Sequence, residues 1–145
     1  MINSPKEITD KSLLEQLKPG IVIRTEVQFP DGQKGVKRLI ILTKSNINSV
    51  LMIATTSKHI KRKYYEKDNI QLTSNQEKVF EKYTSIQLTR VFEKTTSELQ
   101  NAYNQHRLNI LGEISKELLY KIFEIIASSE VIEEKYKIRI KEENK

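Results

Sequence analysis

Residues 21–29 alternate between hydrophobic and polar side chains, which is the period-two pattern of a strand with one buried face. A second strand is predicted at residues 36–42, where the last four positions are all apolar. A third apolar run occupies residues 50–54. Continuous runs rich in β-branched residues predict central strands that are covered on both faces. Residues 30–35 join the first two strands through a polar turn that contains glycine.

Three further segments have strand patterns, at residues 69–73, 84–91 and 107–111. Several short strands in close succession are typical of a small antiparallel barrel. A chain of 145 residues is long enough to bury a substantial core, and its pattern shows no repeat and no linker. We therefore expect a single domain over residues 1–145, mainly β with added helices.

The clearest helix begins after Ser115, a residue type whose hydroxyl caps helix N-termini. Glu117 lies in the first turn, where a negative charge suits the helix dipole. The helix has a broad apolar face, which we expect to pack on the sheet. That face comprises Leu118, Leu119, Ile122, Phe123, Ile125 and Ile126.

Three further segments lie outside the predicted strands and the helix after Ser115. Residues 1–18 are expected to form a short N-terminal helical extension, which Pro19 and Gly20 terminate. Residues 95–101 are expected to form one or two helical turns. The charged tail at residues 130–145 has three open interpretations: an edge strand, an extension of the preceding helix, or a segment that only a partner orders.

Composition narrows the classes of function. The net charge of +6 favours an anionic partner, and nucleic acid is the commonest one. The absence of cysteine excludes disulfides and thiolate metal sites, and two separated histidines fall short of a transition-metal site. No apolar run approaches the roughly 20 residues that cross a membrane. The N-terminus has no apolar signal core, so we expect a cytoplasmic protein without a membrane partner.

Hydroxyl groups and positive charges meet at the end of the third predicted strand. Thr55, Thr56 and Ser57 follow the apolar run, and residues 58–65 then carry four positive charges and two tyrosines. Lysines can follow phosphates, tyrosines can stack on unpaired bases, and a hydroxyl can donate to a developing oxyanion. These residues predict a site for a phosphodiester backbone. The plainer alternatives are a threonine that caps a turn and a solvated basic loop. His59 and His106 have no spacing that indicates an acid–base pair, and we interpret both as surface residues.

The order of these segments resembles the MazF/PemK family of toxin–antitoxin endoribonucleases. The resemblance covers about residues 18–129 and rests on segments 18–20, 31–35, 37–42, 50–57, 85–88 and 111–122. It implies an SH3-like antiparallel barrel of the CcdB/MazF type with a C-terminal helix packed on it, usually as a homodimer. It also implies an antitoxin partner that occludes the site.

The activity implied by the resemblance is sequence-selective cleavage of single-stranded RNA, without a metal or cofactor. The neighbouring 2′-hydroxyl attacks phosphorus, while an arginine and a hydroxyl stabilise charge. The family hydroxyl falls on Thr56, and the family arginine falls on Lys37, or on Arg38 if the alignment shifts by one residue. Successive strand residues face opposite ways, so only one of these two cations can face the site. The acidic residue that often follows the Pro-Gly pair in the family is replaced here by Ile21.

The other candidates for holding RNA lie in the polar turn, at the strand end and in the basic segment. They are Gln33, Lys34, Thr55, Ser57, Lys58, Lys61, Arg62, Tyr64 and Tyr65. A competing interpretation is a barrel that binds nucleic acid or protein without cutting. Another is a toxin resembling the gyrase poisons that share this fold, which would use the tail from Val131 onwards.

Overall fold

The computed structural model describes residue 13 and residues 15–28, 31–44, 48–57, 69–73 and 76–144. Within these ranges none of the helices is both long and apolar enough to cross a membrane. The elements follow one another as β1 (Ile21–Gln28), β2 (Lys34–Ile41), β3 (Ser49–Thr56), β4 (Asn69–Leu72), β5 (Thr84–Thr95), α2 (Thr96–Asn104), β6 (Asn109–Glu113), α3 (Lys116–Ser128) and α4 (Glu134–Glu143).

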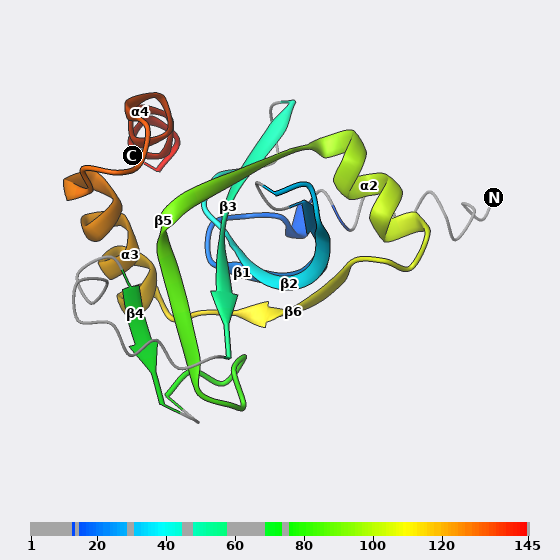
Figure 1. Ribbon diagram of the computed structural model, residues 1–145, viewed down its shortest axis with the longest axis horizontal. Coiled ribbons are helices and arrows are strands. Elements are labelled where there is room, and N and C mark those ends of the chain that lie inside the picture. Colours follow the sequence, from blue (N-terminus) through cyan, green and yellow to red (C-terminus); the bar gives the residue numbers. More distant parts are fainter. Residues whose placement is uncertain are drawn as a thin grey trace.

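The strands form one antiparallel sheet in the order β4-β5-β3-β2-β1-β6. The sheet curls strongly, so that β3 and β5 pass over the hairpin of β1 and β2 (Figure 1). It is a half-barrel, because β4 and β6 remain its two edges among the described strands. The prediction of a mainly β, antiparallel barrel-type fold with added helices is confirmed.

Each face of the sheet carries its own hydrophobic core, which explains the continuous apolar runs of β2 and β3. On one face Ile40, Leu51 and Ile53 pack with residues of α3 and α4, including Ile122 and Ile140. On the other face Leu39, Ile41, Val50 and Met52 pack with Leu99 of α2 and with the N-terminal residues Leu13 and Leu17. Alternate residues of one strand therefore enter different cores.

The alternation predicted for β1 is confirmed, with one difference. Ile23 and Val27 are buried, and Arg24 and Gln28 are exposed. Val22 is also fully buried, although it faces away from Ile23, because it joins the core beneath α3. Strand β1 is thus covered on both faces near Val22 but on only one face near Arg24. The uncovered face leaves space for a site.

Ser115 caps α3 as predicted, and a distant residue supports it. The Ser115 hydroxyl accepts a hydrogen bond from the Leu118 amide at 3.2 Å. The Glu77 carboxylate accepts from the Ser115 amide at 2.7 Å and from its hydroxyl at 2.9 Å. Glu77 also places negative charge at the positive end of the helix dipole. The loop before β5 is therefore attached to the start of α3.

Helix α2 extends three residues beyond the expected segment at its C-terminal end, and its start is a capping box. The Glu98 amide donates to the Thr95 hydroxyl at 3.0 Å, and the Thr95 amide donates to the Glu98 carboxylate at 3.2 Å. Strand β6 begins two residues later than predicted. The Arg107 amide instead donates to the Ala102 carbonyl at 2.7 Å and closes the C-terminus of α2.

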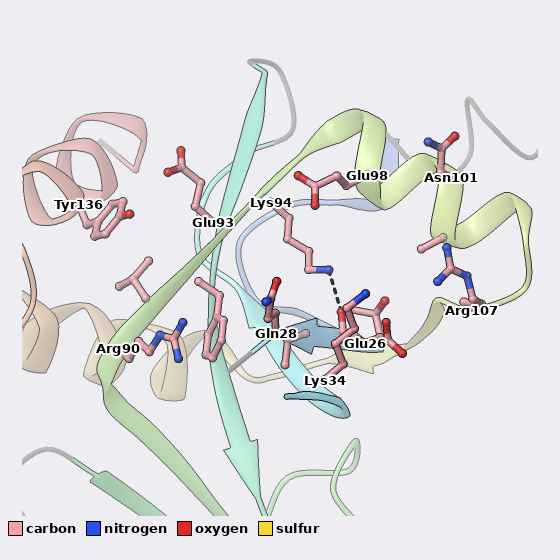
Figure 2. A pocket seen from close by; sticks show the side chains of 15 residues that line it. Glu26, Gln28, Lys34, Arg90, Glu93, Lys94, Glu98, Asn101, Arg107 and Tyr136 are labelled. Carbon is pink, nitrogen blue, oxygen red and sulfur yellow. Dashed lines mark hydrogen bonds between the residues drawn. The ribbon is translucent and has the colours of Figure 1, made fainter. Parts of the chain in front are cut away.

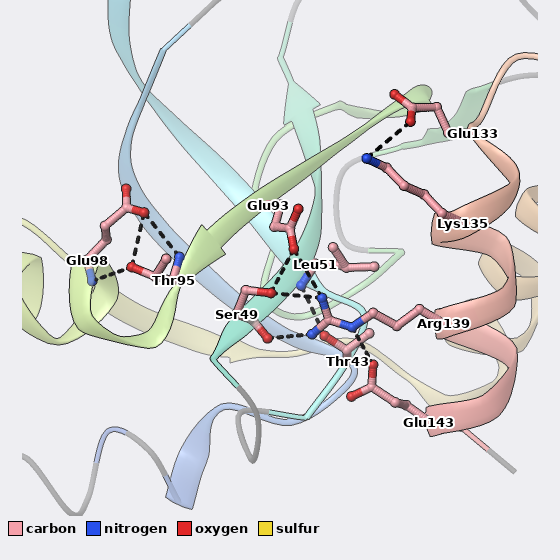
Figure 3. Close-up of polar contacts among 10 residues, drawn as sticks. All are labelled: Thr43, Ser49, Leu51, Glu93, Thr95, Glu98, Glu133, Lys135, Arg139 and Glu143. Carbon is pink, nitrogen blue, oxygen red and sulfur yellow. Dashed lines mark hydrogen bonds and ion pairs between the residues drawn. The ribbon is translucent and has the colours of Figure 1, made fainter.

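The charged tail forms helix α4, so the edge-strand interpretation is wrong. Arg139 fastens this helix to the sheet: its guanidinium donates to the Ser49 hydroxyl at 2.8 Å and pairs with Glu93 at 3.3 Å (Figure 3). Ile140 is buried while Ile138 is 50% exposed, as expected for a helix with one buried stripe. Most of the predicted N-terminal helical extension lies outside the described residues.

Candidate nucleic-acid interface

A groove of about 340 Å³ lies where the exposed half of the β1–β2 hairpin meets the end of β3 and the start of β5. We call it the basic groove. Its lining residues carry four positive charges, four hydroxyl groups and no carboxylate. They are Arg24, Val36, Lys37, Arg38, Thr55, Thr56, Ser57, Lys82 and Thr84. A concave surface that is lined by positive charges and hydroxyl donors suits a phosphodiester chain.

The basic groove brings together five of the residues predicted from the sequence, namely Lys37, Arg38, Thr55, Thr56 and Ser57. Two others lie outside it. Gln33 is exposed in the turn, where its amide donates to Asp31 at 3.0 Å, and Lys34 lines a different cavity. The remaining RNA-binding candidates, Lys58, Lys61, Arg62, Tyr64 and Tyr65, lie outside the described residues, as does His59. The other histidine, His106, is exposed at the end of α2.

The register of the hairpin separates Arg38 from Lys37. Arg38 pairs directly with Arg24 on β1, whereas Lys37 pairs with Thr25. Directly opposed residues of an antiparallel pair project from the same face. Arg38 and Arg24 therefore share one face, on which both are exposed, and Lys37 shares the other with Thr25, which is buried. The groove contacts both cations, but only the Arg38 face carries a second guanidinium.

The two threonines at the end of β3 differ in their surroundings. Thr55 is 4% exposed, and its hydroxyl donates to the backbone carbonyl of Arg38 at 3.1 Å. Thr56 is partly exposed and pairs with Ser85 on β5. The register between β3 and β5 shifts just before these residues, as at a β-bulge, and such shifts re-aim side chains. Thr56 therefore presents the more accessible hydroxyl.

Four groove residues were missed in the sequence: the apolar Val36 and the polar Arg24, Lys82 and Thr84. Arg24 occupies an ordinary polar position in an alternating strand, so nothing local distinguishes it. Lys82 and Thr84 come from the approach to β5, where the Thr84 hydroxyl donates to the Lys82 carbonyl at 3.1 Å. Burial raises the pKa of the intervening Tyr83 phenol, so this residue adds no negative charge beside the groove.

A larger cavity of about 660 Å³ lies between β1, β5 and α2 (Figure 2). This cavity is lined by charges of both signs. The positive side chains are Lys34, Arg90, Lys94 and Arg107, and the negative ones are Glu26, Glu93 and Glu98. Lys94 is already engaged, since its ammonium donates to the Glu26 carbonyl at 2.7 Å. The Arg90 guanidinium stacks 4.4 Å from the centre of the Phe92 ring. The carboxylates make this cavity less suited to a polyanion than the smaller basic groove.

No family model matches the sequence, and a search of curated proteins finds no match either. Solved structures do resemble the fold. One is an endoribonuclease in complex with its cognate antitoxin from a mycobacterial species, at 14% identity and a TM-score of 0.52, with 77% of this chain and 91% of that chain covered. Another belongs to the MazE–MazF complex from Deinococcus radiodurans, at 10% identity and a TM-score of 0.52, with 77% and 92% covered. At these identities the likeness concerns the fold.

Proposed function

We propose that this protein is the toxin of a type II toxin–antitoxin system, and that it cleaves single-stranded RNA sequence-selectively without a metal. The observation that carries the proposal is the basic groove, where four cations and four hydroxyls line one surface with no carboxylate among them. The fold that holds the groove is similar to an endoribonuclease solved with its antitoxin and to a chain of a MazE–MazF complex.

The proposed reaction is attack by the 2′-hydroxyl oxygen on the adjacent phosphorus. The bond from phosphorus to the 5′-oxygen breaks, which leaves a 2′,3′-cyclic phosphate and a 5′-hydroxyl. Water takes the proton of the 2′-hydroxyl, and the departing 5′-oxygen receives a proton from solvent, so no net proton is released. A 2′-hydroxyl nucleophile restricts the substrate to RNA.

Four of the groove residues have a part in this reaction. The Arg38 guanidinium offers two parallel donors and a positive charge to the non-bridging oxygens. Thr56 donates a hydrogen bond to the oxygen on which negative charge develops. Lys37 and Lys82 supply further positive charge for the pentavalent transition state and the strand around it.

The proposal extends to partners and location. The protein acts as a homodimer in the cytoplasm, and a cognate antitoxin covers the basic groove with an extended or helical segment. The support is the resemblance of the chain to toxins that work this way, together with the positive groove, which an acidic segment would complement.

The test is to incubate the purified protein with mixed single-stranded RNA in EDTA and to map the ends of the products. Cyclic phosphate ends from the wild-type chain, and their loss in Arg38→Gln and Thr56→Val, would support the proposal. Lys121→Gln, on the exposed side of α3, is the matched control and should cut normally. Tight RNA binding with no cut ends would instead identify a binding module.

A further inference from the structure

We propose that Arg24 is a second phosphate-binding guanidinium, which holds the phosphate next to the scissile one and so directs the RNA across the strands. The inference rests on the proposed function for the identity of the polyanion. Nothing in the local sequence distinguishes Arg24. The strand register alone brings this residue to the groove.

The first argument is the order of the groove residues across the sheet. Thr56 lies on β3, Arg38 on the neighbouring β2, and Arg24 on β1 directly opposite Arg38. Neighbouring strands are about 4.8 Å apart. The end of β3 that carries these groove hydroxyls, the first guanidinium and the second guanidinium therefore follow one another across three neighbouring strands, with Thr55 bonded to the Arg38 carbonyl at the β3 side. This order defines a path for an extended chain of regularly spaced charges.

The second argument is energetic. Like charges directly opposed in a sheet destabilise it. Within the described part of the chain neither Arg24 nor Arg38 forms an ion pair with a carboxylate. The nearest acid on the same face of β1, Glu26, lines the other cavity. An uncompensated arginine pair costs stability unless an anionic ligand neutralises it, so the pair indicates a ligand with more than one negative charge.

The third argument assigns the two guanidiniums to different phosphates. One phosphodiester carries a single negative charge and two non-bridging oxygens, and the fork of Arg38 can satisfy both oxygens. A second guanidinium beside it gains most from the next phosphate of the strand. Arg24 is therefore a positioning residue, which raises affinity and fixes the direction of the strand but does not stabilise charge at the reacting phosphorus.

The experiment separates binding from cleavage. A mixed-sequence RNA 20-mer with 2′-O-methyl groups throughout resists this reaction, and its affinity is measured by fluorescence anisotropy over a range of KCl concentrations. Arg24→Gln should weaken binding about five- to tenfold at low salt and reduce the slope of log affinity against log salt by about 0.7, the value of one phosphate contact on a single strand. Arg24→Lys should restore the slope, and Lys121→Gln should not change it.

Cleavage kinetics and stability complete the test. Arg24→Gln should act mainly on KM, whereas Arg38→Gln should act mainly on kcat. The melting temperature of Arg24→Gln should equal or exceed that of the wild type, since a like-charge pair is relieved, which excludes misfolding as the cause of weak binding. An unchanged salt slope in Arg24→Gln, with intact RNA binding and cleavage, would overturn this inference and leave the proposed function standing. A wild-type chain that neither binds nor cuts RNA would overturn both.

Discussion

The hydroxyl of Thr55 donates a hydrogen bond to the backbone carbonyl of Arg38, 3.1 Å away, across the junction of β2 and β3. The regular pairing of these strands ends at Leu39 and Ala54, so this bond continues the connection between them by one residue. It fixes the backbone from which the Arg38 side chain projects. Thr55 therefore holds the groove together, whereas the proposed reaction assigns the chemical role to Thr56.

Replacing each threonine by valine should show this division. Thr55→Val leaves a carbonyl without its donor and should lower the free energy of unfolding by about 1 kcal/mol. Thr56→Val changes a partly exposed side chain and should lower stability less than Thr55→Val does. It should slow RNA cleavage about 100-fold or more, as loss of a donor to a developing oxyanion does. Urea unfolding and single-turnover cleavage measure the two effects. Equal loss of activity in both variants at unchanged stability would contradict the assignment.

Exchanging the cations should identify the one that acts at phosphorus. Arg38→Lys keeps the charge but loses the planar fork, so we expect kcat to fall about tenfold or more. Lys37→Arg keeps a charge on the other face of β2 and should alter kcat much less. Expression of the double variant Thr56→Ala with Arg38→Ala should relieve growth arrest. A well-expressed double variant that remains fully toxic would exclude the proposed site.

Glu77 should contribute to stability from outside α3. Its carboxylate accepts two hydrogen bonds from Ser115, so Glu77→Ala should lower the free energy of unfolding by about 1–2 kcal/mol. Glu81→Ala removes an exposed carboxylate from the same loop and serves as the control, with no change in melting temperature expected. If the two variants have the same melting temperature, the contact with Ser115 does not stabilise the helix in solution.

Arg139 should hold α4 on the sheet. Its side chain is 23% exposed and bonds to Ser49, Glu93 and Glu143. Arg139→Met should cost about 1–3 kcal/mol, the range for charged hydrogen bonds with partners left behind. Hydrogen exchange should show α4 amides losing protection while β3 amides keep theirs. Lys135→Met, at an exposed ion pair on the same helix, should leave the exchange pattern unchanged.

Ser85 is a fully buried residue whose hydroxyl makes no hydrogen bond within the described part of the chain. Removing a buried polar group that lacks a partner is neutral or favourable. Ser85→Ala should therefore raise the free energy of unfolding by up to about 1 kcal/mol, whereas Ser85→Val should lower it by about 1–3 kcal/mol through overpacking. Thermal unfolding of both Ser85 variants tests these two predictions. A clear loss of stability in Ser85→Ala would show that the hydroxyl has a hydrogen-bond partner.

The local pattern of the chain determined most of the elements. Period-two alternation predicted β1, continuous apolar runs predicted β2 and β3, and a serine before an apolar helical face predicted α3. The gathering of Thr55, Thr56 and Ser57 beside positive charge also follows from the sequence, because residues at one strand end are neighbours in any fold. Helix α4 was left open, since its charged residues and one buried stripe fit several structures equally well.

Only the tertiary structure decided which residues share the groove. The pairing of Arg24 with Arg38 depends on register, and a shift of one residue would have turned each side chain to the opposite face. Lys82 and Thr84 reach the groove because β5 pairs with β3, and Glu77 reaches Ser115 across 38 positions of sequence. Local periodicity reports which face of a strand is buried. Long-range pairing sets which charges oppose each other, and this pairing assembled the basic groove from residues that have no distinctive sequence signal individually.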